Sequence, residues 1–248
     1  QKRLLNGEHI HAFDTIRLHQ SGRAIHISTT ISPIYDDKGQ LIGTSEIASD
    51  NTEHIIADQK FKRLSGLYKA LSEINQAIIR MEHEEELFPL VCRCAVDYGN
   101  LSMAWIGVLD PKDSQIKPTA VYGEHNKYLD GITISADASR IEGRGPAGRT
   151  MRENRLIVSN DISKDNTLLP WKERMIGSGW NAACTSPINR GGRPFAVLCV
   201  YHTQTHAFDQ EIVALLRSVS SDITFALDNF DREIQRQSDA DSLRLAAS

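Results

Sequence analysis

The cysteines are the residues of this chain with the greatest capacity for chemistry, as nucleophiles, redox centres or metal ligands. Cys92 and Cys94 are two residues apart in a helical pattern, so their side chains point about 200° apart and cannot hold one ion from one face. Cys184 and Cys199 lie in two runs with strand character and could be neighbours. Thiols inside apolar patterns are typical of reduced core residues, so we expect no metal site and a cytoplasmic protein.

A second candidate for chemistry is the GxGxxG pattern formed by Gly143, Gly145 and Gly148. A dinucleotide site needs a strand immediately before this pattern and a long helix after it. Here a polar stretch precedes it and the helix that starts at Gly145-Pro146 is short. We therefore expect the glycines to serve tight turns, with a small anion at the helix N-terminus as the alternative.

Composition excludes several classes of function. The chain has 248 residues and a net charge of −4, with no basic stretch that interleaves with aromatic residues, so a nucleic-acid partner is not expected. Its apolar runs are too short to span a membrane, and no signal peptide opens the sequence. Because it begins with Gln1 and ends in a helical pattern at Ser248, we expect it to be a piece of a longer protein.

The elements that must position these residues begin with a hairpin at 180–202, where two β-rich runs flank the turn Arg190-Gly191-Gly192-Arg193. Residues 10–50 show three alternating runs separated by turn residues, which predicts a three-stranded antiparallel meander. Asp50, with Glu53 three residues later, predicts a capping box at the start of the next helix.

Helices and further strands complete the pattern. A long helix is predicted over 52–81, a second over 84–98 that Pro89 must either kink or delay, and a last one from 209 to beyond 234. Strands are predicted at 102–109, 115–122 and 156–158, with Pro118 favouring an edge or bulged position, and a short helix at 169–176. This order predicts an α+β fold, an antiparallel sheet with helices on one side.

Six blocks of sequence, in order and spacing, resemble a GAF domain of bacterial cyclic-di-GMP signalling proteins. The resemblance covers about residues 65–232 and is carried by SMAWIGVLD, GRGPAGRTMRENRLIVSNDI, PWKERMIGSGW, AACTSPI, AVLCVYH and AFDQEIVALL. The segment HQSGRAIHISTTISPIYDDKGQLIGTSEIASDNTEH is similar to the last three strands of a PAS domain. The expected domains are therefore a C-terminal part of a PAS domain at 1–51, a connecting helix at 52–81, a GAF domain at 62–236, and an exit helix or linker at 237–248.

The GAF resemblance implies a ligand cavity between the sheet and the crossover segments. The candidate residues combine aromatic rings with a few polar groups, as ligand cavities do. They are Trp105, Tyr122, Asp161, Trp171, Trp180 and Ser186. Packing of the tryptophans in the core is the alternative. The ligand and any cofactor stay unknown: a haem-binding GAF domain would need an axial ligand such as His125, His202 or His206, which is not expected here.

The resemblance implies a sensory or regulatory module that binds a small molecule and controls a diguanylate cyclase or phosphodiesterase domain outside the chain. The chain itself is not expected to be an enzyme. The alternatives are a thiol enzyme that reduces free methionine sulfoxide, as some GAF proteins do with cysteines, and a purely structural dimerisation module. Apolar residues spaced by threes and fours in both long helices predict either packing on their own domain or a parallel homodimer.

Overall fold

The computed structural model describes residues 10–81, 83–124 and 126–246. It divides into two compact units, Gln1–Lys62 and Arg63–Ser248.

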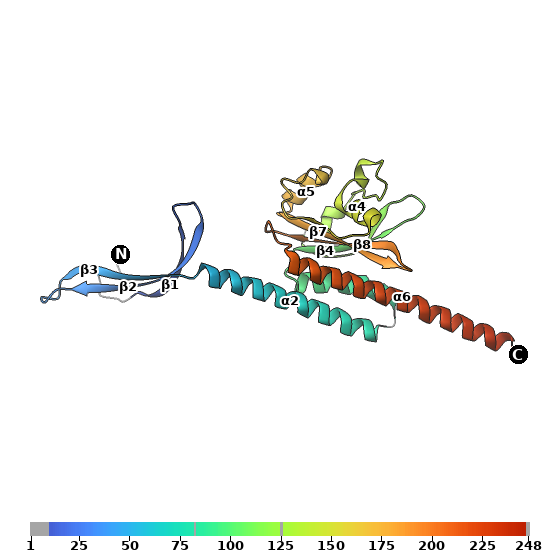
Figure 1. The fold of residues 1–248 in the computed structure, drawn as a ribbon, viewed down its shortest axis with the longest axis horizontal. Coiled ribbons are helices and arrows are strands. Elements are labelled where there is room, and N and C mark those ends of the chain that lie inside the picture. Colours follow the sequence, from blue (N-terminus) through green and yellow to red (C-terminus); the bar gives the residue numbers. More distant parts are fainter. Residues whose placement is uncertain (1–9, 82, 125, 247–248) are drawn as a thin grey trace. The chain divides into compact units, whose positions relative to one another are not determined.

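The first unit contains a three-stranded antiparallel sheet, β1 (Ile10–Leu18), β2 (Ala24–Tyr35) and β3 (Leu41–Asp50), in that order (Figure 1). The meander predicted from the alternation is therefore confirmed. Its last strand leads into helix α2 (Thr52–Arg80). The first backbone bond of this helix runs from the Ile55 N–H to the Asn51 carbonyl oxygen, so Asn51, rather than the predicted Asp50, is the N-cap residue. The Asp50 carboxylate accepts a hydrogen bond of 2.9 Å from the Thr52 backbone N–H.

The second unit is built on a five-stranded antiparallel sheet in the order β5-β4-β8-β7-β6 (Figure 1). Its strands are β4 (Met103–Leu109), β5 (Ile116–Gly123), β6 (Ile157–Ser159), β7 (Ala182–Arg190) and β8 (Arg193–His202). The predicted hairpin is present, and Gly191 and Gly192 have φ values of 59° and 75° in its turn. Pro118 lies on the edge strand β5 at a register shift, as its lack of an N–H predicts.

Three helices cover one face of this sheet: α2, α3 (Leu87–Asp97) and α6 (Gln210–Ala246). Pro89 falls in the first turn of α3, because a short 3-10 helix, η1 (Glu84–Glu86), precedes it. Of the two alternatives for this helix, a kink at Pro89 or a later start, the structure shows the later start. Most of the predicted apolar seam of α2, including the buried Leu67 and Ile74, packs into the core of its own unit.

Short segments cover the other face: η2 (Asn126–Leu129), η3 (Ile141–Gly143), α4 (Pro146–Glu153), η4 (Asn166–Leu168) and α5 (Lys172–Gly177). The prediction of helices on one side therefore holds for the long helices only. The helix predicted at 169–176 was wrong at its start, since residues up to Trp171 belong to a turn and α5 begins at Lys172. Gly145 precedes α4 and Pro146 opens it, as predicted.

Side chains along the central strands point alternately to the two faces of the sheet. On β7 and β8, Cys184 and Leu198 face the long helices, whereas Ala183 and Cys199 face the short segments. Each strand therefore contributes to two distinct cores. None of the helices in the described part of the chain is long and apolar enough to cross a membrane.

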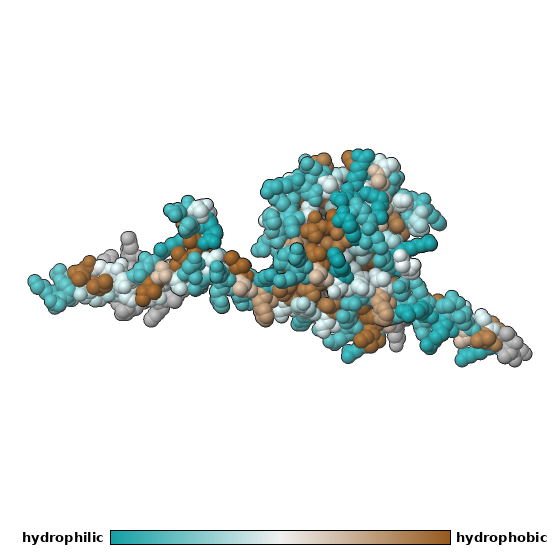
Figure 2. Space-filling view, in the orientation of Figure 1, coloured by the Kyte–Doolittle hydropathy of each residue, from teal (hydrophilic) through white to brown (hydrophobic). Residues whose placement is uncertain are grey.

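Beyond the sheet, α6 continues as a mostly hydrophilic helix (Figure 2). Leu216 and Ile223 are buried in the core, but Ile234, Leu243 and Leu245 are between 62% and 78% exposed. The last turns of α6 thus lie outside the domain core.

Candidate ligand-binding site

A cavity lies between the sheet and the short segments that cross over it. Its volume is about 30 Å³, and every residue that lines it is buried. The lining residues are Trp105, Tyr128, Ile134, Pro146, Ala147, Leu168, Trp171, Met175, Ala183, Thr185, Cys199 and Tyr201. Cavities that bind small molecules have this composition, mainly aromatic and apolar with a few polar groups.

The strands supply the floor of the cavity. Trp105 of β4 and Tyr201 of β8 point to the same face, and the indole Nε1 donates a 3.0 Å hydrogen bond to the Tyr201 hydroxyl. Thr185 of β7 shares a hydrogen bond of 2.7 Å with Thr150 of α4. The buried polar groups of the floor therefore have partners within the protein.

The roof is formed by crossover residues. Tyr128 of η2 stands edge-on to Trp180 and to Tyr201, with ring centroids 5.1 and 5.7 Å apart, and Trp180 stacks on Tyr201 at 4.3 Å. Arg174 of α5 donates hydrogen bonds of 3.3 and 2.9 Å to the carbonyl oxygens of Tyr128 and Asp130. This arginine thus ties α5 to the segment that carries Tyr128.

Trp171 closes the cavity next to Gly145. A Cβ added to Gly145 would lie 2.1 Å from Cζ3 of the Trp171 indole, so the ring rests directly on the glycine backbone. The other glycines of the pattern also allow close approach: a Cβ at Gly143 or Gly148 would meet backbone oxygens at 1.8 and 2.3 Å. None of these three glycines has a positive φ, and Gly148 lies inside α4, so they permit close packing rather than the tight turns that the sequence predicted.

Burial keeps the ionisable groups of the site neutral. Burial raises the pKa of the Tyr128 hydroxyl and that of Tyr201 above their ordinary values. Burial likewise raises the pKa of the Cys199 thiol. A neutral buried thiol is a poor nucleophile, so this lining favours binding over thiol chemistry.

Residues 82–228, more than half of the chain, match the sequence profile of the GAF domain. The chain belongs to the GAF family. A comparison with curated protein sequences finds no relative.

Solved structures share the fold of this GAF domain. The free methionine-R-sulfoxide reductase of Neisseria meningitidis, solved with its substrate, has a TM-score of 0.56 at 14% identity, covering 69% of this chain and 91% of the other. The GAF domain of an Acinetobacter phosphoenolpyruvate-protein phosphotransferase has a TM-score of 0.53 at 13% identity, and the match covers 68% of this chain and 97% of the other. The phycocyanobilin-bound GAF domain of a cyanobacterial phytochrome has a TM-score of 0.53 at 12% identity, and the match covers 67% of this chain and 96% of the other. At these identities the likeness concerns the fold.

The structure brings the three predicted tryptophans of the GAF domain together. Trp105 and Trp171 line the cavity. Trp180 packs against the rings of Tyr128 and Tyr201, which line it. All three are buried.

The three predicted polar residues lie elsewhere, against expectation. Tyr122 is 40% exposed on the edge strand and lines an open surface groove of about 800 Å³ beside α2 and α3. Asp161 turns outward, where its carboxylate accepts hydrogen bonds from Ser163 and pairs with Lys164, which lowers its pKa to about 2. Ser186 faces the long helices and accepts a hydrogen bond from Ser220 of α6.

Three residues that line the cavity were not predicted from the sequence: Tyr128, Thr185 and Tyr201. The alternation of the last strand would have placed Tyr201 with Cys199 on one face, and that of β7 would have placed Thr185 with Ala183. Tyr128 lies in an irregular segment without a periodic signal.

The structure also locates the histidines and cysteines. Among the described residues that line the cavity there is no histidine. His202 is buried on the helix side, where its Nδ1 accepts a hydrogen bond from the Gln204 N–H, and His125 lies outside the described residues. Cys184 and Cys199, expected to be possible neighbours, lie on opposite faces of the sheet.

Proposed function

We propose that this GAF domain is a sensory module that binds a small molecule in the aromatic cavity and controls an output domain outside the chain. GAF domains are small-molecule-binding sensory modules, and one observation favours that role here. The β7–β8 hairpin contributes Ala183, Thr185, Cys199 and Tyr201 to the cavity, while its turn is fastened to α6. A ligand that moves the hairpin would therefore also move α6.

The fastening consists of charged hydrogen bonds at the hairpin turn. Arg190 pairs with Asp231 of α6 and with Glu84 of η1, and the Gly191 N–H donates to the Asp228 carboxylate at 2.9 Å. Charge-assisted bonds of this kind are stronger than neutral ones. From this contact α6 continues to Ala246.

The surrounding organisation is part of the same proposal. Residues 1–51 would be the last strands of a PAS domain, 52–81 the connecting helix, 62–236 the GAF domain and 237–248 the link to an output domain of the diguanylate cyclase or phosphodiesterase type. The meander of the first unit and the sequence similarities given above support this assignment. Such a protein would act in the cytoplasm of a bacterium.

We further propose a homodimer through the long helices. The seam predicted on α2 is occupied by its own core, so the contact would use other exposed residues. Tyr68 and Ile79 of α2 are 60% and 84% exposed and lie about three helical turns apart on one face. Light scattering should give twice the chain mass, and Tyr68→Glu should reduce it to one chain. A native protein of single-chain mass at all concentrations would refute the dimer.

Two other functions have specific observations in their favour. The fold likeness to a free methionine-R-sulfoxide reductase favours a thiol enzyme, although all four cysteines of this chain are buried. The small volume of the cavity favours a purely structural module whose side chains fill the pocket. Thiol-dependent turnover of methionine sulfoxide that is lost in Cys199→Ser would establish the first. A protein that no compound stabilises would establish the second.

The test of the proposed function is a thermal-shift screen of small molecules on the full chain. A specific ligand raises the melting temperature by mass action. Ala183→Ile, which fills the cavity from β7, should abolish that rise while the protein keeps a cooperative transition. Hydrogen exchange of residues 228–246 should change on ligand binding. A ligand insensitive to Ala183→Ile, or one that leaves α6 unchanged, would contradict the proposal.

A further inference from the structure

We propose that the cavity accepts a small, uncharged aromatic molecule whose ring takes the place of the Trp171 indole. This inference rests on the proposed function, in which the cavity is the ligand site, and it specifies the chemical class of that ligand.

The first step concerns charge. Among the described residues, none of the side chains that line the cavity carries a charge. The hydroxyls of Tyr128 and Tyr201 stay neutral because burial raises the pKa of each. An ionised ligand would lose its hydration without gaining a partner of opposite charge, which disfavours binding strongly.

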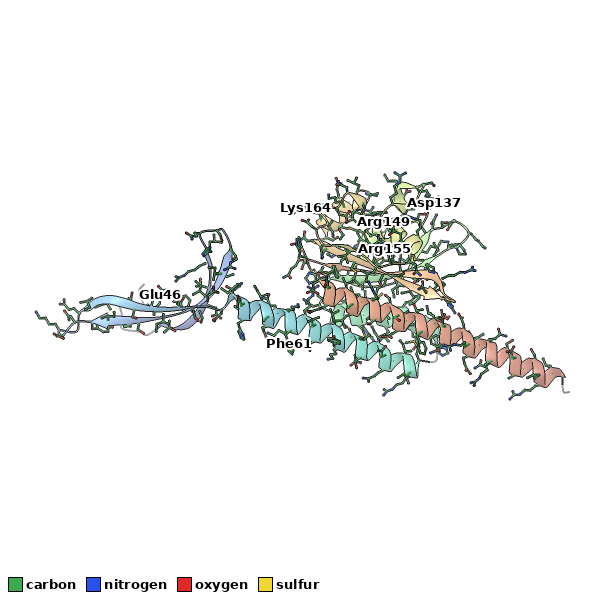
Figure 3. All side chains as sticks on the ribbon, in the orientation of Figure 1. Glu46, Phe61, Asp137, Arg149, Arg155 and Lys164 are labelled. Carbon is green, nitrogen blue, oxygen red and sulfur yellow. The ribbon has the colours of Figure 1, made fainter. Side chains whose placement is uncertain are left out.

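The charged residues near the cavity do not line it: Arg174 donates its hydrogen bonds to the carbonyl oxygens of Tyr128 and Asp130, and the others are in ion pairs. Arg149 and Arg155 both pair with Glu153, and Lys164 pairs with Asp161. Figure 3 shows Arg149, Arg155 and Lys164 among the crossover segments on that side of the sheet. A carboxylate or phosphate in the cavity would therefore have to draw Arg174 away from these two carbonyl oxygens to gain a cation.

The second step concerns hydrogen bonds. The Trp105 N–H is used by Tyr201, and Thr185 bonds to Thr150 and, at 3.4 Å, to the Ile157 carbonyl oxygen. A hydroxyl that already donates can still accept one further bond. The site thus suits a ligand with one or two polar groups on an apolar ring, rather than one with many.

The third step concerns size. A volume of about 30 Å³ equals the space of a single water molecule in the liquid, so a larger ligand must displace a side chain. Trp171 is the aromatic residue of the lining with the highest exposure, at 7%, and it stands just before the six-residue helix α5. Leu169 and Ile176, on either side of it in sequence, are 64% and 48% exposed.

Displacement of Trp171 would leave a hollow with the shape of an indole. The ring rests against Gly145, where there is no side chain to fill the space. A flat ring can therefore replace it with the same contacts to glycine. Movement of α5 requires that Arg174 release the carbonyl oxygens of Tyr128 and Asp130, and that Met175 shift within the cavity-side core. In the free protein the Trp171 indole thus plugs the site, and the ring of an aromatic ligand would replace it there.

The experiment uses indole, which has the ring that occupies the site, and indole-3-acetate, which carries the same ring with a negative charge. Isothermal titration of the full chain at pH 7 should show saturable 1:1 binding of indole. The anion should bind at least tenfold more weakly.

Two glycine variants test the plug. Gly145→Ala should weaken indole binding at least tenfold, because the added Cβ would lie 2.1 Å from the ring position that the ligand takes over from Trp171. Gly177→Ala on α5 is the matched control, since its added Cβ meets nothing within 4 Å, and should leave the affinity unchanged. Trp171→Phe, which enlarges the site, should instead strengthen indole binding, and it tests the inference even if Gly145→Ala does not fold.

The outcomes separate the inference from the proposed function. If the native protein and Trp171→Phe both fail to bind indole, or if Gly145→Ala binds it as tightly as the native protein, the inference is overturned. Tighter binding of indole-3-acetate, abolished by Ala183→Ile, would overturn the ligand class but sustain the cavity as the ligand site. Indole binding that Ala183→Ile leaves intact would place it outside the cavity and overturn the inference, while a screened ligand blocked by Ala183→Ile would still support the proposed function.

Discussion

Arg190 and Asp231 join the tip of the β7–β8 hairpin to α6 through two hydrogen bonds, from Nε to Oδ2 at 2.8 Å and from Nη2 to Oδ1 at 2.5 Å. The same guanidinium donates to both carboxylate oxygens of Glu84, at 2.6 and 2.9 Å. Its side chain is only 23% exposed, and hydrogen bonds to the two carboxylates raise its pKa above the ordinary value. The contact is thus a partly buried ionic network of three residues.

Removal of this network should destabilise the GAF domain and free α6. We expect Arg190→Ala to lower the free energy of unfolding by about 1–2 kcal/mol, because two carboxylates lose their shared cation. Amide exchange around Asp231 should rise. Arg236→Ala is the control on the same helix: its side chain is 81% exposed, and the change should cost less than about 0.5 kcal/mol. Equal effects of the two substitutions would show that the network adds nothing.

The buried hydroxyl pair Ser186–Ser220 should behave non-additively. Ser220 Oγ donates to Ser186 Oγ at 2.8 Å, and both residues are buried between β7 and α6. Ser220→Ala leaves a buried hydroxyl without this partner and should cost about 1–3 kcal/mol. The double variant Ser186→Ala, Ser220→Ala should recover part of that loss in denaturant unfolding. A double variant with the full sum of the single losses would refute the pairing.

Stability should fall in mild acid because of His202. Burial, with a contribution from the positive charge of Arg63, lowers its pKa from 6.5 to about 4. Between these values the unfolded chain binds a proton that the folded chain does not, so stability decreases as the pH falls. The decrease is at most about 1.4 kcal/mol per pH unit. Urea unfolding of the native protein and of His202→Gln from pH 7 to pH 4 should show a shallower slope for the variant, and parallel slopes would contradict the assignment.

The cysteines should react slowly in the native protein. All four are free and buried, and burial raises the pKa of Cys92 to about 12 and that of Cys184 above its ordinary value. Thiolate is the reactive form, so an aromatic disulfide reagent should label little of the native protein and all four thiols in denaturant. Rapid labelling of Cys199 in the folded state would instead favour the thiol-enzyme alternative.

Sequence patterns predicted the elements of this fold more fully than its site. The hairpin around Gly191-Gly192, the edge strand with Pro118 and the opening of α4 at Pro146 follow from local chemistry that admits few alternatives. The start of the helix near Trp171 was misplaced, because an apolar spacing does not reveal a turn held by Asp165 and the carbonyl of Leu168.

The site residues depended on information that residue type alone does not carry. Tryptophans are large and mostly buried, so they were found together. Ser186 and Thr185 are adjacent small polar residues on β7, and only the phase of the strand decides which one reaches the cavity. Tyr128 reaches the site through a chain path that no periodicity describes.

The alternation of β7 and β8 also determines how this protein can be engineered and how it can diversify. Ala183, Thr185 and Cys199 touch only the cavity side, while their neighbours Cys184 and Leu198 pack under α6. Substitutions at the first set can therefore change what is recognised and leave the helix contact intact, and substitutions at the second set can change the response and leave recognition intact. The same two strands thus determine ligand recognition through one set of alternating residues and the contact with α6 through the other. To combine the pocket of one such protein with the helix contact of another, single residues must be changed, because exchanging a whole strand would transfer both properties.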